Sequence, residues 1–469
     1  MVLPVTFEEI IISQTMKTII SSILVFLAVP AFSQINFVRK STWEDVSMLA
    51  KTEKKLIFLH LEDNSCEECN EVASKAFASV DVKDIFGQNY ISLKANLETE
   101  EGRKLADKFD VKKGQVSLFL DANANILTRL NGVAGAGFMY AEQADLALKR
   151  RVGKQLNDYA REYSTGARSQ KFLEEYIIKR RQAGMPVDEL LEKYTGGLPL
   201  DSLSNFRIIK FIYAHGPSID SKVYKAIQAI TPRQIIDSMY RTGPYQEAVA
   251  MNNAIISTTM QKAIAKKDRN LAFQLSHFVQ GTYNPDYWQG MVASQRNTVR
   301  YYYEIRDTTQ YIREAGQFLD NIHMRLTADS LRRMDEKLMN PAKIAISGSK
   351  TKQSHPQMPQ SHLYHLDLNE HAWHVFQMSS KADDLERALK WSYQCQEFFN
   401  SLYKDTAHPM RLGNSAYIDT YAQLLYKLGR KEEAIEWQTK AVEAQRITGN
   451  SHASFEKTLE KMKDGTLLK

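Results

Sequence analysis

Residues 56–69 read Leu-Ile-Phe-Leu-His-Leu-Glu-Asp-Asn-Ser-Cys-Glu-Glu-Cys, an apolar run followed closely by two cysteines three positions apart. The apolar run predicts a buried β-strand. If a helix opens at Ser65, Cys66 and Cys69 lie on one face of it, and their sulfurs can form a disulfide. Unpaired backbone N–H groups at the start of such a helix stabilise a thiolate. The segment therefore indicates a thiol–disulfide redox site.

A structural zinc site is the chemical alternative for this cysteine pair. Zinc in such sites is usually held by four protein ligands, yet the chain of 469 residues has only one further cysteine, Cys395. The pattern therefore favours redox chemistry, and we predict neither a metal ion nor another cofactor.

Strand-like and helix-like patterns alternate on both sides of the cysteine pair, which predicts α/β architecture for residues 34–150. The expected helices cover residues 43–50, 66–78, 100–109 and 140–149. The expected strands cover residues 55–61, 90–96, 117–121 and 126–130. The last two are expected to form a hairpin, because the Asp and Asn residues of 121–125 suit a turn.

This segment resembles a thioredoxin-fold domain of the secreted thioredoxin family, a likeness that covers about a quarter of the chain. The strand before the cysteines belongs to the likeness, and the matching residues are Trp43-Glu44-Asp45, Cys66-Glu67-Glu68-Cys69, Ala78, Glu101-Gly102, Leu105-Ala106, Phe109-Asp110-Val111 and Phe119-Leu120-Asp121. The resemblance implies that Cys66 is the attacking thiol and Cys69 the resolving thiol.

The chain departs from the family pattern at positions around this site. Gln115 stands where the family has a cis-proline facing the disulfide, and the resemblance implies substrate binding by Gln115 and Val116. A cis bond before a non-proline residue costs about 2.5–4 kcal/mol, so we expect a trans bond there. His60 takes the place of a carboxylate that relays a proton to the resolving cysteine. An imidazole with its ordinary pKa of about 6.5 suits this role, but a strand histidine that only packs and hydrogen-bonds is the alternative.

The N-terminal segment predicts export. Residues 16–33 have the pattern of a secretory signal peptide, with an apolar stretch over 19–29 and the small residues Ala31 and Ser33 in cleavage spacing. Residues 1–15 are interpreted as an upstream mis-start. Because the apolar stretch is shorter than the ~20 residues of a membrane span, we expect a mature chain without a span, in the periplasm or outside the cell.

Helical periodicity replaces the strand patterns beyond residue 150. We expect helical hairpins over 151–345, a polar linker over 346–360 and helical repeats over 361–469. Residues 417–444 resemble one tetratricopeptide repeat, with small residues at the close-packed positions Ala422, Gly429, Ala434 and Ala441. A looser copy covers 372–398, where Ala388 and Trp391 match Ala434 and Trp437. Cys395 is expected to be an inert core residue. The fold class is therefore a thioredoxin-like α/β domain followed by an all-α repeat region.

Histidines cluster late in the chain and include two His-x-x-His spacings: His355, His362, His365, His371 and His374. Imidazoles three positions apart on a helix can share a metal ion. We find no complete ligand set in the sequence, so we predict no metal and expect polar helix surface.

Charge and composition narrow the choice of partner. The 61 basic and 55 acidic residues give a net charge of +6 without a concentrated basic run, which argues against nucleic acid. Two hypotheses remain. One is an exported oxidoreductase whose partners are protein disulfide clients and an electron-donor protein, with repeats that bind protein or peptide. The other is a non-catalytic interaction scaffold.

Overall fold

The computed structural model describes residues 35–39, 41–64, 67–111, 114–339, 359–403, 412–449 and 451–468. The chain divides into two compact units. The first runs to Ala167 and also takes in Lys179–Met185, and the second comprises Arg168–Ile178 and Pro186–Lys469. The predicted mis-start over 1–15 and signal peptide over 16–33 lie outside the described residues, as does nearly all of the predicted linker.

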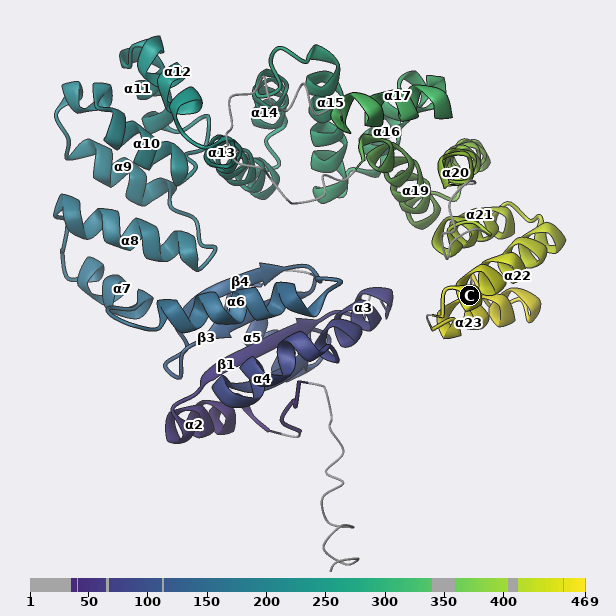
Figure 1. Ribbon diagram of the computed structural model, residues 1–469, viewed down its shortest axis with the longest axis horizontal. Coiled ribbons are helices and arrows are strands. Elements are labelled where there is room, and N and C mark those ends of the chain that lie inside the picture. Colours follow the sequence, from purple (N-terminus) through teal and green to yellow (C-terminus); the bar gives the residue numbers. More distant parts are fainter. Residues whose placement is uncertain are drawn as a thin grey trace, which may run out of the picture. The chain divides into compact units, whose positions relative to one another are not determined.

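The first unit is an α/β structure built on a four-stranded mixed sheet (Figure 1). Its strands are β1 (Leu56–Glu62), β2 (Tyr90–Asn96), β3 (Val116–Leu120) and β4 (Ile126–Asn131), in the order β2-β1-β3-β4. Strands β1 and β2 are parallel, whereas β3 is antiparallel to both β1 and β4. The helices are α2 (Trp43–Glu53), α3 (Glu67–Phe77), α4 (Val80–Asn89), α5 (Glu100–Lys108), α6 (Gly137–Arg150) and α7 (Leu156–Ser164).

Helices cover both faces of this sheet, which explains why β1 is buried from Leu56 to Leu61 and is apolar there except at His60. On one face, Phe58 packs in a buried cluster with Phe77 of α3, Phe86 of α4 and Tyr140 of α6. The other face is covered by α2 and α5, and its cluster includes Ile57, Leu59, Leu61, Trp43, Val46 and Leu105. Successive residues of β1 point to opposite faces, so both helix layers are anchored on the strand that leads to the cysteine pair.

The start of α5 lies very close to the end of β2. Thr99 caps the helix by accepting a hydrogen bond from the N–H of Gly102 at 3.0 Å. A Cβ atom at Gly102 would lie 1.8 Å from the main-chain oxygen of Asn96. Glycine is therefore required here because the backbones approach closely.

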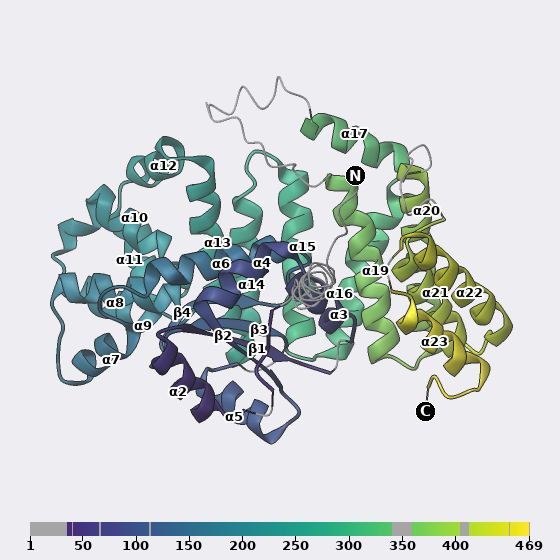
Figure 2. The same ribbon diagram turned by 60° about the horizontal axis from the view of Figure 1, so that its bottom comes forward.

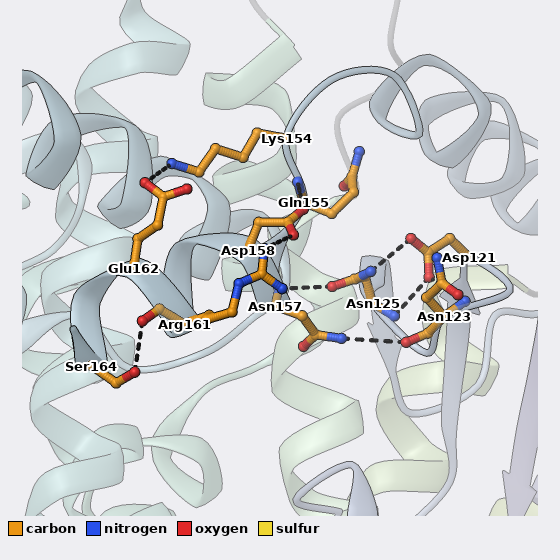
Figure 3. Close-up of polar contacts among 10 residues, drawn as sticks. All are labelled: Asp121, Asn123, Asn125, Lys154, Gln155, Asn157, Asp158, Arg161, Glu162 and Ser164. Carbon is orange, nitrogen blue, oxygen red and sulfur yellow. Dashed lines mark hydrogen bonds and ion pairs between the residues drawn. The ribbon is translucent and has the colours of Figure 1, made fainter. Parts of the chain in front are cut away.

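Helix α7 is attached to the turn between β3 and β4 (Figure 3). Within the turn, Asp121 accepts hydrogen bonds from the backbone N–H groups of Asn123 and Asn125, each at 2.9 Å. Asn125 is buried, and its Oδ1 accepts a hydrogen bond of 2.8 Å from the N–H of Asn157 in α7. Asn157 in turn donates from Nδ2 to the main-chain oxygen of Asn123 at 3.3 Å. These amides make α7 part of the first unit.

All described elements of the second unit are helices, and α8 crosses the boundary between the units. Consecutive helices lie side by side in it (Figures 1 and 2). The helices are α8 (Gln170–Gln182), α9 (Asp188–Gly196), η1 (Leu200–Ser204), α10 (Phe206–Ala214), α11 (Lys222–Ile230), α12 (Arg233–Thr242), α13 (Tyr245–Lys266), α14 (Arg269–Gly281), α15 (Tyr287–Glu304), α16 (Thr308–Asn321), η2 (His323–Arg325), α17 (Ala328–Met339), α19 (Gln360–Met378), α20 (Ala382–Tyr403), α21 (Ser415–Lys427), α22 (Lys431–Ile447) and α23 (Ala453–Lys463).

The last helices pack as hairpins. Helices α21 and α22 are joined through Gly429, whose φ of +85° is a left-handed conformation that favours glycine. Ala422, Ala434 and Ala441 are fully buried, so the two helices can approach closely. In the preceding hairpin, Ala388 and Trp391 of α20 are buried, and so is Cys395.

The coarse prediction of an α/β region followed by a helical region is confirmed, although helix α4 was not predicted. The expectation that the late histidines form polar helix surface is wrong for two of them, since His365 and His371 are buried. The reason is that α19 packs against α16, α17, α20 and α21 and has little free surface. His355 lies outside the described residues. Within the described part of the chain, no helix is both long and apolar enough to cross a membrane.

Candidate functional site

Cys69 lies in the first turn of α3, which follows β1 after a short connection. It is partly buried and takes part in a disulfide bond. Cys66 lies outside the described residues. Cys395 is a free, fully buried thiol, and burial raises its pKa well above the ordinary value. The two described cysteines therefore differ: one is oxidised in the α/β unit, and the other is reduced in a helical core.

Asn70, the residue after Cys69, connects α3 to both neighbouring strands. Its Nδ2 donates a hydrogen bond of 3.2 Å to the main-chain oxygen of Asp63, just beyond β1. Its Oδ1 accepts a hydrogen bond from Nε2 of Gln115, just before β3. The fold thus brings Gln115 beside the cysteine-bearing turn. Asn70 was not singled out by the sequence analysis, because its partners are distant in the chain or belong to the main chain.

Gln115 is buried, with only 6% of its surface exposed. The peptide bond before it is trans, since the cis bonds of the described residues are confined to Asn284–Pro285. Its Oε1 is buried and has no hydrogen-bond partner among the described residues. The Nε2 of Gln115 is bonded to Asn70, but its Oε1 can still accept a hydrogen bond from another molecule. The neighbouring Val116 is buried in the core, so only its main chain is suited to contact a substrate.

His60 is fully buried in β1, on the face covered by α3. Its Nδ1 is hydrogen-bonded to the hydroxyl oxygen of Ser117 at 2.9 Å, and its ring contacts the ring of Phe77 at 5.0 Å between centroids. Burial, helped by the nearby positive charge of Lys94, lowers the pKa of His60 to about 3. The imidazole is therefore neutral at neutral pH and packs and hydrogen-bonds in the core. Its role as a proton relay stays a prediction.

A second set of amides fixes the loops at the carboxyl ends of β1 and β2. Asn64 donates from Nδ2 to the carboxylate of Glu98 at 2.7 Å, and Asn96 donates to Oδ1 of Asn64. Because β1 and β2 are parallel, these loops lie at the same edge of the sheet as the start of α3. The connection between β1 and the cysteine-bearing helix is thereby held by side-chain hydrogen bonds.

The helical unit contains a separate pocket of about 490 Å³, formed by residues of α10 to α14. Tyr213, Tyr224 and Tyr240 line it, and burial raises the pKa of each of these phenols. Gln228 donates to the hydroxyl of Tyr213 at 2.7 Å, and the hydroxyl of Tyr240 donates to Asn252 at 2.9 Å. Aromatic walls with a few placed polar groups are typical of ligand pockets.

No protein-family model matches this chain, and no curated protein matches it either.

Proposed function

We propose that the protein is an exported thiol–disulfide oxidoreductase that reduces or exchanges disulfides in protein clients. The observation that carries the proposal is the disulfide-bonded Cys69 in the first turn of α3, directly beyond the buried strand β1. The mixed four-stranded sheet with helices on both faces is compatible with a thioredoxin-like domain. The position of Gln115 beside the cysteine-bearing turn supports its proposed role in substrate binding.

In the proposed reaction, the thiolate of Cys66 attacks one sulfur of a client disulfide. A Cys66–client disulfide forms, and the other client sulfur leaves as a thiolate. The thiolate of Cys69 then attacks Cys66, which closes the Cys66–Cys69 disulfide and releases the second client thiolate. The client gains two electrons, and a dithiol electron-donor protein returns two electrons to the cysteine pair.

The helical unit is proposed to recruit protein partners as a tetratricopeptide-like array. Its support is the pair of helices α21 and α22, in which Ala422, Ala434 and Ala441 are buried at the positions where the repeat family needs small residues. Stacked repeats of this kind build extended binding surfaces from units that contact their neighbours.

The test is to replace the resolving cysteine and look for trapped clients. With Cys69→Ala, a Cys66–client disulfide cannot be resolved, so we expect disulfide-linked adducts on non-reducing gels that disappear with reductant. The Cys395→Ala variant is the matched control, because that buried thiol lies in the helical unit. The control should trap nothing and should reduce a model disulfide at the rate of the unmodified protein.

The second candidate function is a peptide-binding scaffold, and the tyrosine-lined pocket favours it. Tyr245 and Val249 line the pocket and are both exposed, so Tyr245→Ser with Val249→Ser leaves the core intact. On a peptide array, we expect this double variant to lose binding by at least about 10-fold, the effect of about 1.4 kcal/mol. Tyr287→Ser is the control, since Tyr287 is exposed and does not line the pocket. A protein that neither traps clients nor reduces disulfides, but binds peptides through this pocket, is a scaffold.

A further inference from the structure

Helices α16 and α19 bring four polar side chains together in the helical unit. The hydroxyl of Tyr311 on α16 is hydrogen-bonded to Nδ1 of His371 at 2.7 Å and to Nδ1 of His374 at 2.8 Å. Glu370 lies beside them on α19, and one ligand atom from each of Glu370, His371 and His374 lies within 4.8 Å of the others. Two imidazoles and a carboxylate thus converge next to one phenol oxygen.

The hydrogen bonds of this cluster are incomplete. A phenol has a single proton, so Tyr311 can donate to only one of the two imidazoles and must accept from the other. His371 is 5% exposed, and its Nε2 has no hydrogen-bond partner among the described residues. A buried polar atom without a partner is costly and calls for a missing group. Both Nδ1 atoms are thus satisfied by Tyr311, and a metal ion bound at Nε2 of His371 would supply the partner that this buried nitrogen lacks.

The surroundings hold the side chains in position and leave a route for an ion. The ring of Tyr303 stacks on the ring of His374 with centroids 3.9 Å apart, which fixes the orientation of that imidazole. Tyr311 is fully buried behind the cluster, whereas Glu370 is exposed to solvent. An ion can therefore enter from the side of Glu370 and stop against the buried tyrosine.

The type of ligand indicates the type of ion. Imidazole nitrogens with one carboxylate form a common zinc set, whereas magnesium and calcium prefer oxygen ligands alone. Zinc–ligand bonds of about 2.0–2.2 Å place ligand atoms roughly 3.4 Å apart in a tetrahedron, so small side-chain movements suffice to close this site. Tyr311 then either completes the tetrahedron or orients an imidazole by hydrogen bonding.

We propose that Glu370, His371 and His374 bind a zinc ion beside the hydroxyl of Tyr311. The site connects α16 to α19, which are separated in the sequence by residues 322–359. It is independent of the cysteine pair, because all four side chains belong to the second unit.

The experiment uses tag-free full-length protein, stripped with a chelator and titrated with Zn²⁺ against a chromophoric zinc indicator. We expect one tight equivalent, and a rise in melting temperature on binding. Glu370→Gln and His374→Ala should each weaken binding by at least about 10-fold, the lower limit for loss of a group that supports a zinc site. Glu370→Gln replaces an exposed side chain with one of the same shape, so it preserves the fold.

His362→Ala is the matched control, because His362 lies on the same helix in the other His-x-x-His spacing. It should bind zinc like the unmodified protein. Tetrahedral Co²⁺ gives intense visible absorption, and this band should be lost in Glu370→Gln. The absence of one saturable equivalent, or equal affinity in Glu370→Gln and the unmodified protein, would overturn the proposal.

Discussion

The buried His60 should make the first unit sensitive to mild acid. Its pKa is about 3 in the folded protein, against the ordinary 6.5 that it regains on unfolding. Below pH 6.5 the unfolded chain binds a proton that the folded chain does not, so stability falls as the pH falls from about 6.5 towards 3. One such histidine lowers the folding stability by about 2–3 kcal/mol over two pH units in this range.

We therefore expect the free energy of opening of β1 to decrease by about 2 kcal/mol between pH 6.5 and 4.5, as measured by hydrogen exchange corrected for intrinsic rates. His60→Leu should lose most of this pH dependence, because leucine has no proton to bind. His277→Leu replaces an exposed histidine of the other unit and should leave the profile of β1 unchanged. A profile that is the same in His60→Leu and the unmodified protein would show that His60 does not cause the effect.

Replacing a glycine by alanine is expected to have opposite effects on stability in helices α5 and α4. Gly102→Ala forces α5 away from the main-chain oxygen of Asn96, so it should lower the free energy of unfolding by about 1–3 kcal/mol. Gly87 is exposed in α4 with nothing near its missing Cβ, so Gly87→Ala should stabilise the protein by up to about 1 kcal/mol. Pulse proteolysis in urea measures both changes. Equal effects of the two substitutions would contradict the close approach of α5 to β2.

The side-chain amide of Asn125 is expected to hold α7 on the turn between β3 and β4. Asn125→Ala leaves the N–H of Asn157 without its acceptor, and we expect α7 to lose about 1–3 kcal/mol of protection in hydrogen exchange. The control is Asn123→Ala, since Asn123 contacts α7 through its main-chain oxygen and its side chain is exposed. Similar losses of protection in both variants would mean that Asn125 has no special role.

Local patterns predicted most elements but few of their contacts. The apolar run over 56–61 and the strand over 90–96 could be predicted because each lies within one window of sequence. Helix α4 was missed because its β-branched residues and Gly87 weaken the helical signal, and its burial depends on packing against α6. The contact of Gln115 with Asn70 joins positions 45 residues apart, so it depends on the sheet. The contacts of Tyr311 with His371 and His374 join positions 60 and 63 residues apart, so they depend on the packing of α16 against α19.

In the second unit, helices α15, α16 and α17, which precede residue 340, contact α19 and α20, which follow residue 358. Asp367 of α19 is buried, accepts hydrogen bonds from Arg296 of α15 at 2.6 to 3.2 Å, and lies 2.9 Å from Nε2 of His323. Burial alone would raise the pKa of Asp367, but its hydrogen bonds with His323 and Arg296 hold that pKa at about 2. Asp320 of α16 likewise accepts a hydrogen bond of 2.7 Å from Trp391 of α20.

These contacts predict that the second unit survives a cut in the expected linker. With a protease site inserted within 346–360, we expect the cleaved chain to elute as one species in size-exclusion chromatography, because the buried contacts do not pass through the linker. Asp367→Asn in the cleaved protein should separate the two fragments. It removes the charge of the buried Asp367 carboxylate, the partner of the half-buried Arg296 guanidinium, and breaking a buried ion pair typically costs about 3–5 kcal/mol of stability. Asp329→Asn, at an exposed aspartate of α17, is the control and should leave the fragments together. Separation of the fragments without any substitution would mean that residues 361–469 form a domain of their own.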